Sequence, residues 1–391
     1  MLGTILTRLA AGVALGLLAA GAASAQGVVK IGVIEAMTGQ QQSTGVQTLA
    51  AMKLYMQQHG DTVAGKKIEL IVKDDGAVAD NAKRLAQELI VRDKVNVLIG
   101  FAVTPTALAV APLATEAKIP TIVANAGTSI ITERSPYILR TSFTLPQSSE
   151  IIGEWAAKNG VKKVVTIVSD YAPGIDAEKS FTAAFTKGGG QVAEALKVPL
   201  AAPDFAPFLQ RARDASPDAV FVFVPSGQGA TFVKQFIERG LDKAGIKIIG
   251  TGDVTDDDLL NGMGDQVIGT VTAHMYSADH PSELNKKYVE AFKKANNGLR
   301  PNFMSVGGYD AMHLVYEALK KTNGDTNGDK LLAAMKGMAW ESPRGPISID
   351  PETRDIVQNI YVRKVEKKNG ELYNVEFETF KDVKDPGKAK K

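Results

Sequence analysis

Apolar and polar positions along the chain follow an alternation of short strands and longer helices. Continuous β-branched and aliphatic runs at residues 28–35, 95–99 and 161–169 are typical of strands that are buried on both faces. Segments with helical periodicity, such as residues 46–59 and 81–93, lie between strands of this kind. A repeated strand–helix order predicts a parallel sheet that helices cover on both faces.

This pattern restarts after Phe143, which indicates a second domain. A helix is expected over residues 146–159, and further strands and helices alternate from there to about residue 276. A length of 391 residues also exceeds what a single hydrophobic core usually serves. We therefore predict an α/β fold of two domains, each built on a doubly wound parallel sheet.

The first 25 residues have the composition of a secretory signal peptide. Arg8 is the only charged residue among them, an apolar run covers residues 9–20, and Ala23-Ser24-Ala25 supplies the small residues that signal peptidase accepts. The apolar run is short for a membrane-spanning helix, so we expect cleavage before Gln26 and no stable membrane anchor.

Charge and cysteine content narrow the class of protein further. The net charge is only +2, with basic and acidic residues well mixed, so no nucleic-acid partner is indicated. The chain has no cysteine, so an exported form depends on a large core in place of disulfides and has no cysteine for a lipid anchor. Residues 381–391 hold five lysines against two aspartates and are expected to form a basic, solvated tail.

The strongest candidate site lies at two consecutive strand ends in the first domain. After the strand at residues 95–99, Thr104 is placed as a helix N-cap and Pro105 as the first helical residue. The next strand ends in the turn Asn125-Ala126-Gly127-Thr128. In a parallel sheet both ends face one crevice, where hydroxyls and free backbone N–H groups suit a carboxylate. Helix capping alone would explain Thr104 but not the second hydroxyl turn. The candidate ligand-binding residues in this domain are Thr104, Thr106, Ala126 and Thr128.

Three further candidates follow strands of the second domain. Asp253 comes after a short apolar strand, where an acid either meets a cationic group of a ligand or favours a helix start. Tyr171 follows the strand at residues 161–169, and an aromatic side chain there either closes over a ligand or packs on the surface. Ser226 follows another apolar strand in the same way.

The two strand ends, the sequence IGVIEAMTG at residues 31–39 and the sequence GDVTDDDL at residues 252–259 together resemble the type I periplasmic solute-binding proteins of branched-chain amino acid importers. The resemblance covers nearly all of the chain after residue 26. It implies two lobes that are joined by three hinge crossings. Lobe one is then expected at residues 27–145 plus 277–345, and lobe two at residues 146–276 plus 346–380.

The resemblance also implies roles for the candidate residues. In the family, the Ser/Thr turn after one strand and the Ala-x-Thr turn after the next hold the ligand carboxylate, and an acid at the position of Asp253 meets the ligand ammonium. Here Pro105 occupies a position where relatives often have serine, so either Thr104 or Thr106 faces the cleft. The turn at residues 124–128 is closer to that of relatives which bind aromatic carboxylates, so both ligand classes stay open.

The implied function is that of a periplasmic receptor that delivers a small carboxylate-bearing solute, by default a branched-chain or other apolar amino acid, to an ABC importer. Its partners are then a small-molecule ligand and an inner-membrane permease, and the protein is a monomer without metal or cofactor. Two alternatives are a receptor for aromatic carboxylates and a ligand sensor that works with a membrane kinase. No P-loop, G-x-S-x-G or H-E-x-x-H motif occurs, so an enzyme is not expected.

Overall fold

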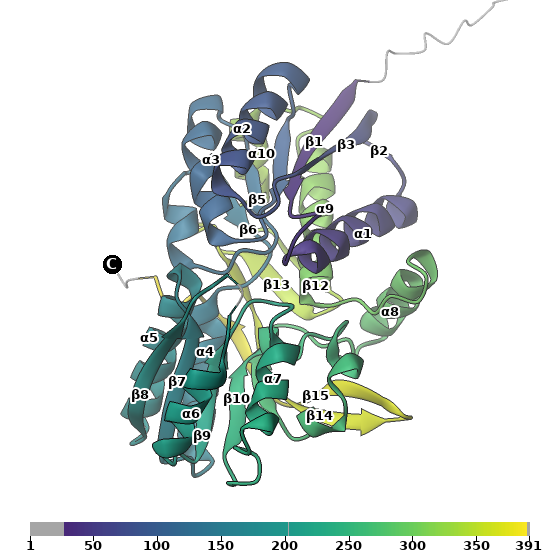
Figure 1. Ribbon diagram of the computed structural model, residues 1–391. Coiled ribbons are helices and arrows are strands. Elements are labelled where there is room, and N and C mark those ends of the chain that lie inside the picture. The colour runs from purple at the N-terminus through teal and green to yellow at the C-terminus, as the bar shows by residue number, and fades with distance from the viewer. Residues whose placement is uncertain (1–26, 202, 389–391) are drawn as a thin grey trace, which may run out of the picture.

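The computed structural model describes residues 27–201 and 203–388, and these form two lobes that each contain one sheet (Figure 1). The predicted signal peptide lies outside the described residues. The first sheet has the strand order β2-β3-β1-β4-β5-β6, and all neighbours are parallel except β2 and β3. Its strands are β1 (Val28–Glu35), β2 (Thr62–Val63), β3 (Lys66–Asp74), β4 (Val97–Gly100), β5 (Thr121–Val123) and β6 (Ile138–Arg140).

Helices cover both faces of this first sheet, because alternate residues of its strands are apolar on each side. Val97 and Ile99 of β4 pack toward α1, α9 and α10, whereas Leu98 packs toward α2 and α3. The helices and the π-helical and 3-10 segments of this lobe are α1 (Gln42–His59), α2 (Ala79–Glu88), η1 (Leu89–Asp93), α3 (Thr104–Ala117), η2 (Ser129–Glu133), α9 (Phe303–Lys321) and α10 (Gly328–Met335).

The second sheet has nine strands in the order β12-β13-β14-β11-β10-β9-β7-β8, with β15 also paired to β14. Helices α4 and α5 lie on one face, and α6 and α7 on the other. The strands are β7 (Lys163–Ser169), β8 (Gln191–Val198), β9 (Ala219–Phe223), β10 (Lys247–Thr251), β11 (Val271–His274), β12 (Ala339–Ser342), β13 (Gly345–Ile349), β14 (Ile356–Lys368) and β15 (Glu371–Val383). The helices are α4 (Leu145–Lys158), α5 (Ala172–Lys187), α6 (Ala206–Asp214), α7 (Gly229–Glu238), and the short 3-10 segments η3 (Gly252–Thr255), η4 (Leu260–Met263) and η5 (Asp265–Val267).

The second sheet has the expected parallel strands in one part and an antiparallel part at its other end. Strands β7 to β11 are parallel, but β12 to β15 pair antiparallel. The reason is local: β14 and β15 are joined by Asn369-Gly370, whose φ angles of 52° and 85° suit a tight hairpin turn. Strands that are joined by such a turn can only run antiparallel.

The chain passes between the lobes three times, as expected for this fold (Figure 1). The crossings lie between β6 and α4, between β11 and α8 (Glu283–Ala295), and between α10 and β14. Buried arginines fix these segments. Arg344 donates to the carbonyl oxygen of Ser142 at 3.0 Å and forms a 2.8 Å ion pair with Asp310. Arg140 forms a 2.6 Å ion pair with Asp355.

The C-terminal segment differs from the solvated tail that its composition suggests. Residues 381–383 complete β15, and Asp385 is buried, where it accepts hydrogen bonds from the hydroxyls of Ser129 (2.9 Å) and Thr144 (3.0 Å). Lys388 forms a 3.1 Å ion pair with the hinge residue Asp355. Lys388 also donates to the hydroxyl of Thr132 at 2.9 Å, which lies more than 200 residues earlier, so the chain up to Lys388 is part of the hinge.

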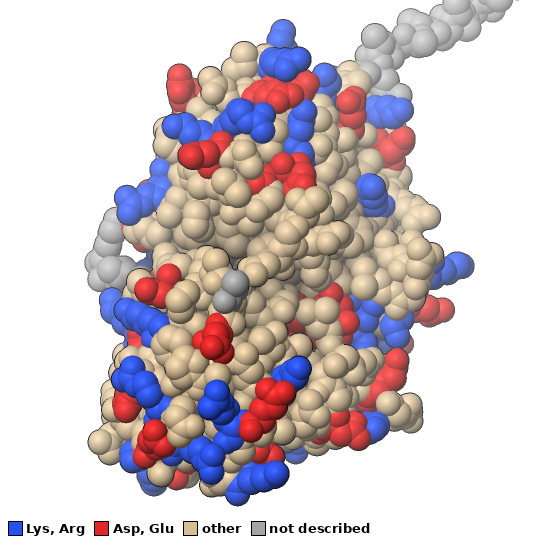
Figure 2. Space-filling model, in the orientation of Figure 1, with Lys and Arg blue, Asp and Glu red and all other residues tan. Residues whose placement is uncertain are grey.

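Charges on the outer surface are well mixed. Lys and Arg side chains alternate with Asp and Glu side chains over the face in Figure 2, without a patch of one sign. Among residues 27–201 and 203–388, no helix combines the length and the apolar character that a membrane span requires.

Candidate functional site

The site begins at a strained turn at the end of β4. Gly100 has φ +132°, and a Cβ atom there would overlap the carbonyl oxygen of Ile34 in β1. Phe101 follows with φ +74°, a conformation that non-glycine residues rarely adopt. Such strain is often found where a fold must place functional groups. Here it directs the chain from the sheet into the start of α3.

Thr104 and Thr128 meet across the two strand ends. Their hydroxyl oxygens are 2.6 Å apart, and both residues are buried. Helix α3 begins at Thr104 with Val103 as its N-cap, so the expectation that Thr104 caps the helix is wrong. The reason is that the hydroxyl of Thr128 competes for the Thr104 side chain. Because one hydroxyl of the pair donates to the other, the pair keeps one O–H donor for a ligand.

Thr106 points elsewhere, which resolves the choice between the two threonines. Its hydroxyl donates to the carbonyl oxygen of Val103 at 2.8 Å, and Thr106 does not line the cavity that Thr104 lines. Its hydroxyl proton is therefore already used within the first turn of α3. Of the two, Thr104 is the residue that faces the cleft.

Backbone N–H groups complete the first-lobe end of the site. Within the described residues, the N–H groups of Thr104 and Gly127 have no hydrogen-bond acceptor, and both residues line the cavity. The N–H of Ala126, by contrast, donates to the carbonyl oxygen of Phe101 at 3.0 Å, so Ala126 lines the cavity without offering its N–H. Gly127 has no room for a Cβ atom, which would overlap Leu145. Two free N–H groups beside one hydroxyl donor form a suitable cradle for a carboxylate.

A cavity lies between the lobes and is partly open to solvent. Its walls are mainly apolar and aromatic. The residues that line it are Gln41, Ala102, Val103, Thr104, Asn125, Ala126, Gly127, Phe143, Leu145, Tyr171, Pro173, Phe223, Pro225, Ser226, Asp253 and Met304.

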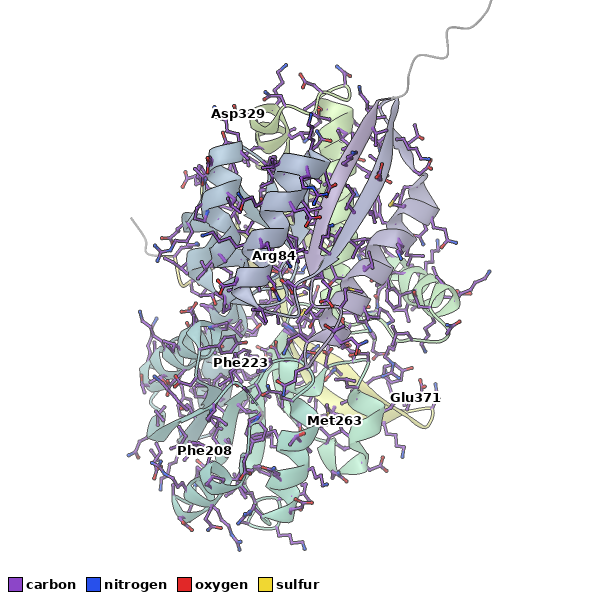
Figure 3. All side chains as sticks on the ribbon, turned by 45° about the horizontal axis from the view of Figure 1, so that its top comes forward. Arg84, Phe208, Phe223, Met263, Asp329 and Glu371 are labelled. Carbon is purple, nitrogen blue, oxygen red and sulfur yellow. The ribbon has the colours of Figure 1, made fainter. Side chains whose placement is uncertain are left out.

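Aromatic rings form the second-lobe wall. Tyr171 lies before α5 and stacks on Phe223 at the end of β9, with ring centroids 6.1 Å apart and an angle of 19° between the rings. Figure 3 shows Phe223 at the end of the second lobe that is nearest to the first lobe. The Tyr171 hydroxyl has no hydrogen bond within the described residues, and burial together with the charge of Asp253 raises its pKa. Tyr171 therefore stays a neutral donor.

In the described part of the chain, Asp253 is the one carboxylate that lines this cavity. It is 4% exposed, and its Oδ2 accepts a hydrogen bond from the Thr251 hydroxyl at 2.9 Å. Burial raises its pKa to about 6, against the opposing effects of the Thr251 hydrogen bond and the positive charge of Arg363. At neutral pH the Asp253 side chain is therefore mostly ionised and accepts hydrogen bonds only.

Ser226 connects the cavity to a group of buried acids behind it. The Ser226 hydroxyl donates to Asp256, which also accepts a hydrogen bond from Asn302 at 3.2 Å. Asn302 is the N-cap of α9, a helix whose later residues pack in the core of the first lobe, so this connection spans the lobes. Ser43 at the start of α1 makes a second such contact, to Asp258 at 2.7 Å.

Sequence reasoning found the polar ends of the cavity and missed its walls. Of the seven candidate residues, five line the cavity. Thr128 does not line it but shares a hydrogen bond with Thr104, and the Thr106 hydroxyl donates to the Val103 carbonyl instead. Phe143, Phe223, Leu145 and Met304 were not anticipated. The sequence could have identified Phe223 as a residue of the cavity, because it ends the strand that precedes Ser226. The sequence gives no such indication for Met304, because it reaches the cavity from the start of a helix late in the chain.

Comparison with known proteins agrees with this geometry. The family described as periplasmic binding protein matches residues 28–371. The Leu/Ile/Val-binding protein homolog 6 of Brucella melitensis is 44% identical over 374 residues, which cover 95% of this chain and 96% of that protein. A solute-binding protein of an ABC transporter from Rhodopseudomonas palustris BisB5, solved in complex with 3,4-dihydroxybenzoic acid, is 71% identical. Its TM-score is 0.91, with 92% of this chain and 99% of that chain covered.

A second Rhodopseudomonas palustris solute-binding protein, solved with 4-hydroxybenzoate, is 42% identical with a TM-score of 0.90, covering 93% of this chain and all of that chain. These matches confirm the two-lobed fold and the resemblance that the sequence motifs indicated. The chain belongs to the periplasmic binding protein family, and it is a solute-binding receptor of the ABC-transporter class rather than an enzyme.

Proposed function

We propose that this receptor binds an aromatic carboxylate in the periplasm and delivers it to the permease of an ABC importer as a monomer. The observation that carries this proposal is the composition of the cavity: a carboxylate cradle at one end and aromatic walls beyond it. The signal peptide expected at residues 1–25 supports the periplasmic location.

The carboxylate end is expected to lie at Thr104 and Gly127. The Thr104 hydroxyl, oriented by Thr128, and the free N–H groups of Thr104 and Gly127 converge there. The start of α3 adds partial positive charge at the same place. A hydrogen bond to a charged group contributes about 1.5–3 kcal/mol, so each donor of this cradle matters for affinity.

The walls favour a flat ring over an aliphatic side chain. Phe143, Tyr171 and Phe223 present rings to the cavity, and the two prolines that line it add flat apolar surface. Stacked or edge-on ring pairs contribute about 0.5–1.5 kcal/mol beyond the burial of area. Similarity to two receptors that were solved with hydroxylated benzoates supports the same class.

An apolar amino acid is the second candidate, because Asp253 offers a counter-charge for an ammonium group and the Brucella relative is described as a Leu/Ile/Val-binding homologue. The two ligand classes are separated by calorimetric titration of the mature protein with benzoate, 4-hydroxybenzoate and leucine. We expect both aromatic acids to bind and leucine to bind far more weakly. Tight leucine binding, with no heat from either aromatic acid, would refute the proposed class.

Two threonine variants test the carboxylate cradle with a matched control. Thr104→Val removes the hydroxyl that faces the cavity and should weaken benzoate binding about 10- to 100-fold. Thr106→Val changes a residue two positions after Thr104, whose hydroxyl donates only to the carbonyl oxygen of Val103. The affinity of this variant for benzoate should stay within a few-fold of wild type. Equal losses in both variants would mean that the cradle lies elsewhere.

A further inference from the structure

The carboxylate of Asp253 is buried in the cavity, and no other described residue donates a hydrogen bond to its Oδ1. Oδ2 accepts a hydrogen bond from the Thr251 hydroxyl, and the backbone N–H of Asp253 also interacts with the carboxylate. Among residues 27–201 and 203–388, no lysine or arginine forms an ion pair with Asp253, and the nearby Arg363 pairs with Asp257 at 3.9 Å. Arg363 lies near enough to affect its charge, but its guanidinium donates to Thr272 and to the carbonyl oxygen of Tyr276. A buried carboxylate oxygen that faces the cavity is stabilised when a ligand there supplies a hydrogen-bond donor.

The donor has to come from the part of the ligand that is remote from its carboxylate. Thr104 and Gly127 belong to the first lobe, whereas Asp253 belongs to the second and adjoins the Tyr171–Phe223 ring pair. A ring that fills the space between them presents its far edge to the second lobe. A hydroxyl on that edge is a neutral donor, so it satisfies Asp253 without bringing another charge into the cleft.

We propose that Asp253 accepts a hydrogen bond from a ring hydroxyl of the ligand, and that this contact makes the receptor selective for hydroxylated aromatic acids over unsubstituted benzoate. The inference rests on the proposed function and adds the residue that sets the substituent. Thr251 is then a positioning residue, because its hydroxyl holds Oδ2 and leaves Oδ1 for the ligand. A ligand without the hydroxyl would leave the buried carboxylate of Asp253 without its donor. A site rejects an analogue that leaves a buried polar group unpaired more strongly than one that lacks only an apolar contact.

The test compares the affinity ratio of 4-hydroxybenzoate to benzoate in three proteins by calorimetry. The wild-type protein should prefer 4-hydroxybenzoate by about 10- to 100-fold. In Asp253→Asn this preference should fall to a few-fold, because the amide is a weaker acceptor and shares its oxygen with Thr251. Benzoate itself should bind the variant as well as or better than wild type, because no buried charge is left without a donor. A normal melting temperature shows that the variant is folded.

Tyr171→Phe tests the other residue on this wall that has an unbonded polar group. It can change the affinity for both acids, but the ratio between the two affinities should stay close to that of wild type. Loss of the ratio in Tyr171→Phe but not in Asp253→Asn would assign the hydroxyl contact to the tyrosine and overturn the inference.

The outcomes also separate this inference from the proposed function. If wild-type protein binds benzoate and 4-hydroxybenzoate equally well, the aromatic-carboxylate function stands and the role of Asp253 is refuted. If neither aromatic acid binds and leucine binding disappears in Asp253→Asn, the proposed function itself fails, because Asp253 then serves an ammonium group. A change in the ratio that appears only in Asp253→Asn supports both.

Discussion

Ligand capture by this receptor should be linked to the uptake of a proton by Asp256. Asp256 is 1% exposed and lies where the lobes meet, bonded to Ser226 of one lobe and Asn302 of the other. Burial raises its pKa well above 3.8, and the negative charge of Asp258 raises it further, followed by smaller effects of other nearby acids. The hydrogen bond from Ser226 opposes the shift.

The charged groups around Asp256 do not cancel the rise in its pKa. The acids that face it are Asp253, Asp257 and Asp258, and the cations of the same region are Arg363 and Arg300, which act mainly on Asp257. Opening the cleft would separate the first-lobe contacts Asn302 and Ser43 from these acids and admit water. The pKa of Asp256 should then return toward its ordinary value.

The sign and size of the pH effect follow from linkage. A carboxyl whose pKa is higher in the closed form binds a proton on closure, so the closed form is favoured at low pH. Affinity is therefore expected to fall as pH rises from the ordinary pKa of 3.8 to the raised one. One proton corresponds to at most a tenfold loss of affinity per pH unit, or about 1.4 kcal/mol. Above about pH 7 the contribution of Asp253, with its pKa of about 6, should be small.

Calorimetry with 4-hydroxybenzoate in two buffers of different ionisation enthalpy gives the number of protons that bind with the ligand. Wild-type protein should take up protons at pH values above the ordinary pKa of 3.8 and below the raised pKa of Asp256. Asp256→Asn should take up none there and lose the slope of affinity against pH. Asp204→Asn changes an exposed acid of the same lobe and should behave as wild type. Proton uptake that is the same in wild type and Asp256→Asn would refute the linkage.

Two further predictions concern the frame that holds the site. Arg344→Met leaves the carboxylate of Asp310 buried without its cation and should lower the free energy of unfolding by about 3–5 kcal/mol in urea titrations. Lys286→Met, at an exposed ion pair, is the control and should leave the free energy of unfolding nearly unchanged. Gly100→Ala combines a positive φ angle with overlap against a carbonyl oxygen of β1, so it should lower the melting temperature clearly more than Gly160→Ala, where φ is also positive but the space is open. Equal effects of the two substitutions would contradict a role of the overlap.

The order of strands and helices was predictable because it depends on local periodicity, and the polar ends of the cavity were predictable because strand ends of a parallel sheet meet at one edge. Thr104 shows the limit of local rules. Its position suits a helix cap, yet its hydroxyl bonds Thr128, 24 residues later in the chain. A short-range rule cannot weigh a competitor that only the folded sheet brings near.

Features that depend on long-range pairing were not predictable in the same way. Arg344 bonds Ser142 in another crossing, and Asp385 bonds residues more than 200 positions earlier. Neither has a periodic pattern or motif in the sequence. Both satisfy buried polar groups at the hinge, and such groups must be paired wherever the fold places them.

The buried acids of the second lobe also bear on how an empty receptor avoids closing. Closure without ligand would bury the free oxygen of Asp253 and the hydroxyl of Tyr171 with no partner, and it would move Asp256 out of water. Each buried polar group without a partner costs about 1–3 kcal/mol, so the closed form without ligand is disfavoured. A ligand that donates to Asp253 while its carboxylate is held at Thr104 removes part of this cost and contacts both lobes at once. Only such two-lobe contacts shift the equilibrium toward the closed form. Selectivity for the ligand and restraint of the empty receptor therefore have the same physical origin in this cavity.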